Sequence, residues 1–63
     1  MTIMYQKEEG KAFKEISQKE FSKIQKDIEN LNKNRNWGYY LLKVTKIDFD
    51  NNIIFIQQFD YEC

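Results

Sequence analysis

The clearest pattern in the chain is a stripe of four apolar side chains at the spacing of one helix face. They are Phe21, Ile24, Ile28 and Leu31. Charged and amide residues fill the positions between them, as in an amphipathic helix that buries one side. Ser17 and Glu20 precede the stripe at the spacing of a capping box, in which each side chain bonds the backbone N–H of the other residue. We therefore predict a helix over about 18–32 that ends in an asparagine-rich turn.

Two runs rich in β-branched and aromatic residues follow, at about 38–49 and 53–61. Asp50-Asn51-Asn52 between them favours a hairpin turn, because asparagine tolerates a positive φ. A two-residue turn would divide the apolar side chains between both faces of the hairpin. A three-residue loop with Asn52 left-handed would pair Phe49 with Ile53 and collect the apolar side chains on one face. We expect this second register, with the helix packed against Leu41, Ile47, Phe49, Ile53, Phe55, Phe59 and Tyr61.

The N-terminal segment has the pattern of a second hairpin. Strands at about 2–7 and 11–16 would flank Glu8-Glu9-Gly10, with the glycine at the position that needs a positive φ. This turn would place Tyr5 opposite Phe13. The expected fold is a single α+β domain over residues 1–63, with one amphipathic helix packed on an antiparallel sheet in the order β-β-α-β-β. If the first segment is irregular, the order is β-α-β-β.

The composition limits how so short a chain can be stabilised. A domain of 63 residues buries only about 60% of the surface that its unfolded chain exposes. One cysteine cannot form an internal disulfide, and there is no histidine for a mixed Cys/His metal site. Yet 41% of the residues are hydrophobic and ten are aromatic. We expect a dense aromatic core, or apolar surface buried between two copies in a homodimer, or both.

Charge is balanced overall but unevenly distributed. Residues 1–46 carry all ten basic residues and six acidic ones, a net charge of +4, whereas residues 47–63 carry four acidic residues and no basic one, a net charge of −4. A DNA mimic would be acidic throughout, and a general nucleic-acid binder would be basic overall. No apolar run is long enough for a signal peptide or a membrane span, and a single thiol fits a reducing compartment, so we expect a cytoplasmic protein.

The sequence offers little for catalysis. Without histidine, the usual general base and the commonest metal ligand are missing, and two glycines cannot build a phosphate-binding loop. Cys63 stands at the end of the chain, where a catalytic thiol is not expected. Asp27 and Glu29 are spaced i, i+2 on a helix and do not face each other, while Asp48 and Asp50 flank a turn. We expect no enzyme activity, no cofactor and no metal site.

Basic and aromatic residues around the helix suggest nucleic-acid binding as an alternative function. The residues that would form this surface are Lys19, Lys23, Lys26, Lys33, Arg35 and Trp37. Proteins that bind single strands combine a basic groove with aromatic side chains on which bases stack. Acidic residues interrupt the lysines here, however, and phosphate affinity increases with the number of charges neutralised. The alternative is therefore a weak single-stranded nucleic-acid or RNA-binding accessory protein.

A second apolar face of the C-terminal hairpin favours a protein partner instead. Alternation places Tyr40, Leu42, Val44, Ile54 and Ile56 on the face that we expect the helix to leave open. Trp37 and Tyr39 would add anchors at its end. The acidic residues Asp48, Asp50, Asp60 and Glu62 would steer a basic target. The other interpretation is that the N-terminal strands cover this face internally.

These features predict a non-enzymatic interaction module. We expect a small inhibitor or regulator that masks a surface of a larger protein or ribonucleoprotein. Lysine, isoleucine and asparagine, all with A/T-rich codons, make up 23 of the 63 residues. This coding bias and the small size are common among phage and mobile-element proteins, including anti-defence proteins such as anti-CRISPR proteins. No membrane partner is expected.

Overall fold

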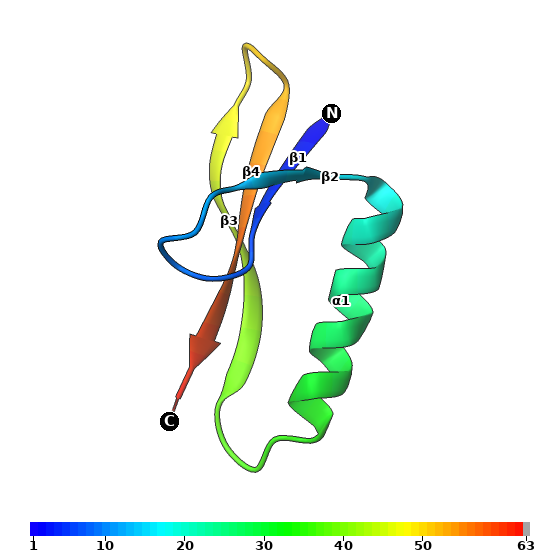
Figure 1. Cartoon of the computed structure of the whole chain (residues 1–63), viewed down its shortest axis with the longest axis vertical. Coiled ribbons are helices and arrows are strands. Elements are labelled where there is room, and N and C mark those ends of the chain that lie inside the picture. Colours follow the sequence, from blue (N-terminus) through cyan, green and yellow to red (C-terminus); the bar gives the residue numbers. More distant parts are fainter. Residues whose placement is uncertain (63) are drawn as a thin grey trace.

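Residues 1–62 form four strands and one helix in the order that the sequence predicts, β-β-α-β-β (Figure 1). The elements are β1 (Thr2–Gln6), β2 (Lys14–Ile16), α1 (Gln18–Lys33), β3 (Tyr39–Asp48) and β4 (Ile53–Tyr61). The structure is a computed structural model that describes residues 1–62, so Cys63 lies outside the described residues. One helix packed on one sheet confirms the α+β fold class.

The local signals at both ends of α1 act as expected. Ser17 Oγ accepts a hydrogen bond from the backbone N–H of Glu20 at 3.0 Å, and Glu20 Oε1 accepts one from the N–H of Ser17 at 3.1 Å. This confirms the predicted capping box. The helix ends at Lys33, and the side chain of Asn34 bonds back to the carbonyl of Asn30 at 3.1 Å. Among residues 1–62, no helix is long and apolar enough to cross a membrane.

The sheet has the strand order β2-β1-β4-β3 and is mixed rather than antiparallel throughout. Within each hairpin the strands are antiparallel, but β1 and β4 lie side by side in parallel. The reason is the helix between the hairpins. The helix runs back along the sheet to the end at which β2 began, so β3 starts at that end and runs in the same direction as β2. Their hairpin partners β1 and β4 therefore also share a direction.

Both predicted hairpin registers are wrong, although both predicted left-handed residues are confirmed. Gly10 has φ +84° and Asn52 has φ +56°. In the first hairpin, Tyr5 lies opposite Lys14 instead of the predicted Phe13. In the second, the loop covers residues 49–52, and the first pair that it closes is Asp48 with Ile53. Farther along, an extra residue between Val44 and Lys46 forms a bulge, which no local pattern indicates.

The helix covers the sheet face opposite to the predicted one. Ile3, Tyr5, Ile16 and Ile56 form the buried core, and Phe21, Ile24, Leu42 and Ile54 pack against it. Leu42, Ile54 and Ile56 thus face the helix, whereas they were expected to face away from it. The cause is β1, which lies beside β4 and sets Ile3 opposite Ile54 and Tyr5 opposite Ile56, extending the apolar face of the hairpin to a third strand. An apolar surface that spans three strands is the better place to bury a helix stripe.

Candidate functional site

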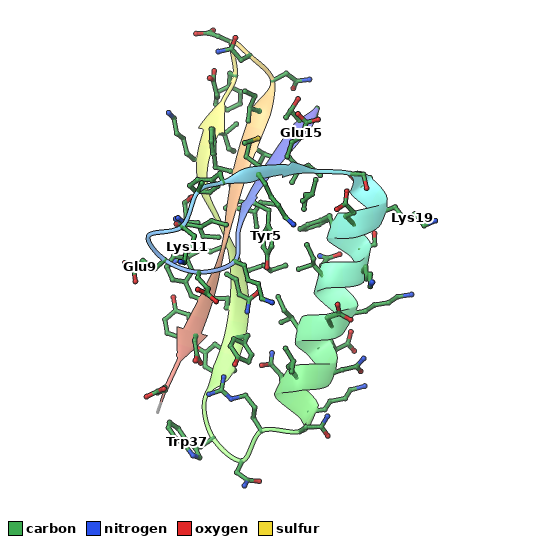
Figure 2. All side chains as sticks on the ribbon, in the orientation of Figure 1. Tyr5, Glu9, Lys11, Glu15, Lys19 and Trp37 are labelled. Carbon is green, nitrogen blue, oxygen red and sulfur yellow. The ribbon has the colours of Figure 1, made fainter. Side chains whose placement is uncertain are left out.

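The face of the sheet away from α1 is the candidate site, and we call it the outer face. Because side chains alternate along a strand, the residues opposite in direction to Leu42 and Ile56 lie on it. From β3 and β4 these are Tyr39, Leu41, Lys43, Lys46, Asp48, Ile53, Phe55, Gln57, Phe59 and Tyr61, since the bulge shifts the alternation of β3 by one residue. Figure 2 shows Trp37 at the lower end of this face, on the side away from the helix. Five of these residues were expected in the core, namely Leu41, Ile53, Phe55, Phe59 and Tyr61, so sequence reasoning missed most of this surface.

Aromatic side chains cover the lower half of the outer face. Tyr39 and Tyr61 are cross-strand partners whose rings stack with centroids 5.2 Å apart, and Phe59 lies 6.2 Å from Tyr61. Tyr39 is 45% exposed, Leu41 is 40% exposed and Trp37 is 56% exposed. We call Trp37, Tyr39, Leu41, Phe59 and Tyr61 the aromatic patch. Its strand residues are cross-strand neighbours, Tyr39 beside Tyr61 and Leu41 beside Phe59, and α1 packs on the other face of the sheet.

The upper half of the outer face is partly covered by the chain itself. Phe13, from the segment between β1 and β2, packs edge-on against Phe55 with ring centroids 5.4 Å apart. Two lysines of β3 lie over aromatic rings: Lys46 Nζ is 5.4 Å from the ring centre of Phe55, and Lys43 Nζ is 5.9 Å from that of Phe59. Such contacts contribute about 0.5–1 kcal/mol at exposed sites. The aromatic patch is therefore the open part of the face, bordered by cations.

The predicted acidic residues do not form one cluster. Asp48 and Asp50 lie at the hairpin turn, whereas Asp60 and Glu62 lie at the opposite end of β4. Asp60 accepts a hydrogen bond at 2.7 Å from Arg35, whose guanidinium also lies over the ring of Tyr40. Asp48 accepts bonds from the side chain and backbone N–H of Asn51, and these bonds lower its pKa. Two of the four acidic residues that were expected to steer a basic target, Asp48 and Asp60, thus bond to other residues of the same fold.

The structure also separates the residues of the predicted nucleic-acid surface. Lys19, Lys23, Lys26 and Lys33 belong to α1, on the far side of the sheet from Trp37 (Figure 2). Lys33 forms an ion pair with Glu29 at 3.9 Å. Arg35 is held by Asp60, which raises the pKa of its guanidinium. Helix lysines and Trp37 therefore do not form a single binding surface.

A second concave surface lies between α1 and the β1–β2 half of the sheet. This groove of about 690 Å³ has Tyr5, Ile16, Ile24 and Ile28 among its apolar lining residues. The hydroxyl of Tyr5 donates a hydrogen bond to Gln58 Oε1 at 2.7 Å, and burial raises the pKa of this phenol. The groove exists because a helix is about 10 Å wide, whereas four strands span roughly 19 Å. Across residues 1–62, no group of side chains is arranged to hold a metal ion.

Comparison with known proteins gives no match: no family model fits the chain, and neither a curated protein nor a solved structure matches it. The function must therefore be argued from the surfaces of the chain itself.

Proposed function

We propose that this protein is a non-enzymatic interaction module that binds a protein partner through the aromatic patch. As a small inhibitor or regulator, it would act by covering a surface of a larger macromolecule. The observation that carries the proposal is the aromatic patch itself, which remains open although the helix buries the other face of the same sheet. Contiguous exposed apolar patches on small proteins mark interaction sites.

The residue types of the patch support a protein partner. Tyrosine, tryptophan and phenylalanine are enriched in the cores of protein interfaces, and tryptophan and tyrosine dominate the residues whose truncation costs most affinity. Tyr39 and Tyr61 hold each other in place by stacking, so little side-chain entropy is lost when a partner covers them. Lys43 lies over the ring of Phe59 and offers a positive charge at the border of the apolar centre.

The matched pair Leu41→Ala and Leu31→Ala tests this proposal. Leu41 is 40% exposed in the patch and Leu31 is 48% exposed on α1, so the two changes remove equal groups of similar exposure from different surfaces. Partners captured from cells of the source organism would be purified and their affinities measured by calorimetry. We expect Leu41→Ala to weaken binding by about tenfold, which corresponds to about 1.4 kcal/mol, and Leu31→Ala to leave it unchanged.

Equal affinities of the two variants for the captured partner would refute the patch as the binding surface. The solution mass of the unmixed protein tests whether the partner is a second copy. Titration with a mixed-sequence single-stranded oligonucleotide, followed by Trp37 fluorescence, tests the nucleic-acid alternative. Saturable quenching at micromolar protein would support that alternative over the proposal.

A further inference from the structure

In the part of the chain that the structure describes, the end of β4 beside the aromatic patch pairs with β3 on one side and with no strand on the other. β1 pairs with β4 from Thr2 opposite Ile53 to Gln6 opposite Gln57, and then the chain leaves the sheet. β4 continues to Tyr61, where it still pairs with Tyr39 of β3. Within residues 1–62, positions 58–61 of this central strand therefore lack a strand on the β1 side (Figure 1).

Backbone groups of Asp60 point to this open side. On the far edge of the sheet, Asn32 Oδ1 accepts a bond from the N–H of Tyr40 at 2.7 Å, and Asn32 Nδ2 donates one to its carbonyl at 3.0 Å. Both groups of Tyr40 thus point away from β4. Its cross-strand partner is Asp60, and in an antiparallel pair such opposite residues both turn their backbone groups outward. The N–H and C=O of Asp60 therefore face the open edge, and neither forms a hydrogen bond within the described residues.

The edge formed by β3 and the open end of β4 differ in their protection against strand addition. On β3, the side chain of Asn32 bonds both backbone groups of Tyr40, a bulge interrupts the strand at Thr45, and Lys43 and Lys46 lie within two residues of the bulge. Clamps, bulges and edge lysines are the devices by which proteins prevent another strand from pairing. The end of β4 has neither a bulge nor a side chain bonded to its outward backbone groups within residues 1–62. The β3 edge is therefore protected against pairing with another strand, whereas the described end of β4 is not.

We infer that an extended segment of the partner protein pairs with this edge as an additional strand in line with β1, a proposal that rests on the proposed function. A cavity of about 440 Å³ lies there, and its lining includes Lys7, Glu8, Glu9, Gln58, Phe59 and Asp60. Asp60 is neutralised by Arg35, so Glu8 and Glu9 outweigh Lys7. This charge favours a segment that carries lysine or arginine.

Strand addition also explains why the open edge adjoins the aromatic patch. Main-chain hydrogen bonds supply affinity in this binding mode, and pockets for alternate side chains supply specificity. Every second side chain of the added strand would lie on the outer face beside Phe59 and Tyr61 of the patch. The edge of four residues accommodates about 13 Å of extended chain. The patch and the edge thus form one site with two kinds of contact.

Nuclear magnetic resonance with a defined peptide tests the inference. The probe is a capped eight-residue peptide of alternating valine and lysine. Its control carries N-methyl groups on two adjacent central residues, one on each edge of the strand. We expect the unmodified peptide to shift the Asp60 amide resonance and slow its hydrogen exchange. Only one of the two N-methyl groups faces β4, and each net hydrogen bond changes affinity by roughly fivefold, so we expect the N-methylated peptide to bind at least about fivefold more weakly.

Two variants at Asp60 provide a second readout on the protein side. Asp60→Pro removes the outward N–H, and Asp60→Ala keeps that N–H while losing the same contact with Arg35. We expect Asp60→Pro to bind the peptide roughly fivefold more weakly than Asp60→Ala. If Asp60→Pro does not fold, the amide measurement on the natural chain decides.

Three results would overturn the inference: equal binding of the two peptides, no saturable binding at millimolar peptide, or an Asp60 amide that binding leaves unchanged. If Leu41→Ala loses the captured partner while the Asp60 amide stays unprotected, the aromatic patch remains the binding surface and only strand addition fails. If an oligonucleotide binds the patch and the peptide does not, both proposals fail.

Discussion

Replacing Asn32 with alanine should remove a large share of the stability of this domain. The half-buried side-chain amide forms two hydrogen bonds with the backbone of Tyr40, at 2.7 and 3.0 Å. A net contribution of about 0.5–1.5 kcal/mol per bond gives a loss of roughly 1–3 kcal/mol. A chain of 63 residues has a total unfolding free energy of roughly 3–9 kcal/mol. For a loss of 2 kcal/mol, the melting temperature should fall by roughly 10 °C.

Asn30→Ala is the matched control. Asn30 is exposed on the same helix, and no hydrogen bond of its side chain is formed within residues 1–62. Both substitutions gain the same helix propensity, so their difference isolates the contacts with Tyr40. Urea unfolding followed by circular dichroism gives the two free energies, and sedimentation velocity shows whether the exposed β3 edge causes self-association. If the two variants have the same unfolding free energy, the amide does not stabilise the edge and the reasoning is refuted.

Three further predictions concern the core, a close contact and a charge. Ile56→Ala in the core should cost about 2–4 kcal/mol of unfolding free energy, whereas Leu41→Ala on the outer face should cost under about 1 kcal/mol; equal losses in urea titrations would contradict the assignment of faces. Both glycines have positive φ, but a Cβ at Gly38 would lie 2.5 Å from a backbone carbonyl oxygen, whereas a Cβ at Gly10 would meet nothing within 4 Å. Gly38→Ala should therefore lower the melting temperature more than Gly10→Ala, and the reverse order would contradict this packing. The hydrogen bonds of the helix cap lower the pKa of Glu20 from 4.5, so the charge of Glu20 stabilises the fold fully above pH 4.5. This contribution is lost as the pH falls through the lower pKa of the folded state, and the thermal-stability advantage over Glu20→Gln should disappear at acidic pH. An advantage that does not change with pH would exclude the charge as its source.

The local elements of the fold could be predicted because the forces that define them act within a few residues. The capping box of Ser17 and Glu20 and the helix stripe are contained in one short segment. The same holds for the turns at Gly10 and Asn52, where the residue type permits a positive φ. Alternation along 39–48 also correctly placed Tyr39 with Leu41 on one face and Tyr40 with Leu42 on the other.

The candidate site could be predicted only in part, because the contacts that select the buried face join residues that are distant in the sequence. Trp37 and Tyr39 were proposed as partner contacts and lie in the aromatic patch. Leu42, Ile54 and Ile56 were proposed with them but face the helix. Alternation shows which side chains share a face, but it does not show which face is covered. Both faces of this hairpin are apolar, so hydrophobicity alone gives no preference between them.

The tertiary structure decides between the faces through one contact that is distant in sequence. β1 lies parallel beside β4, with Ile3 opposite Ile54 across 51 positions of the chain. No local pattern encodes that pairing, because its stability comes from the apolar area buried once β1, β4 and α1 are together. The pairing also ends at Gln6, which leaves the outward backbone of Asp60 open. The sequence by itself determined the helix, the turns and the two-faced strand, whereas the position of β1 determined which face became the core and where an open edge remained.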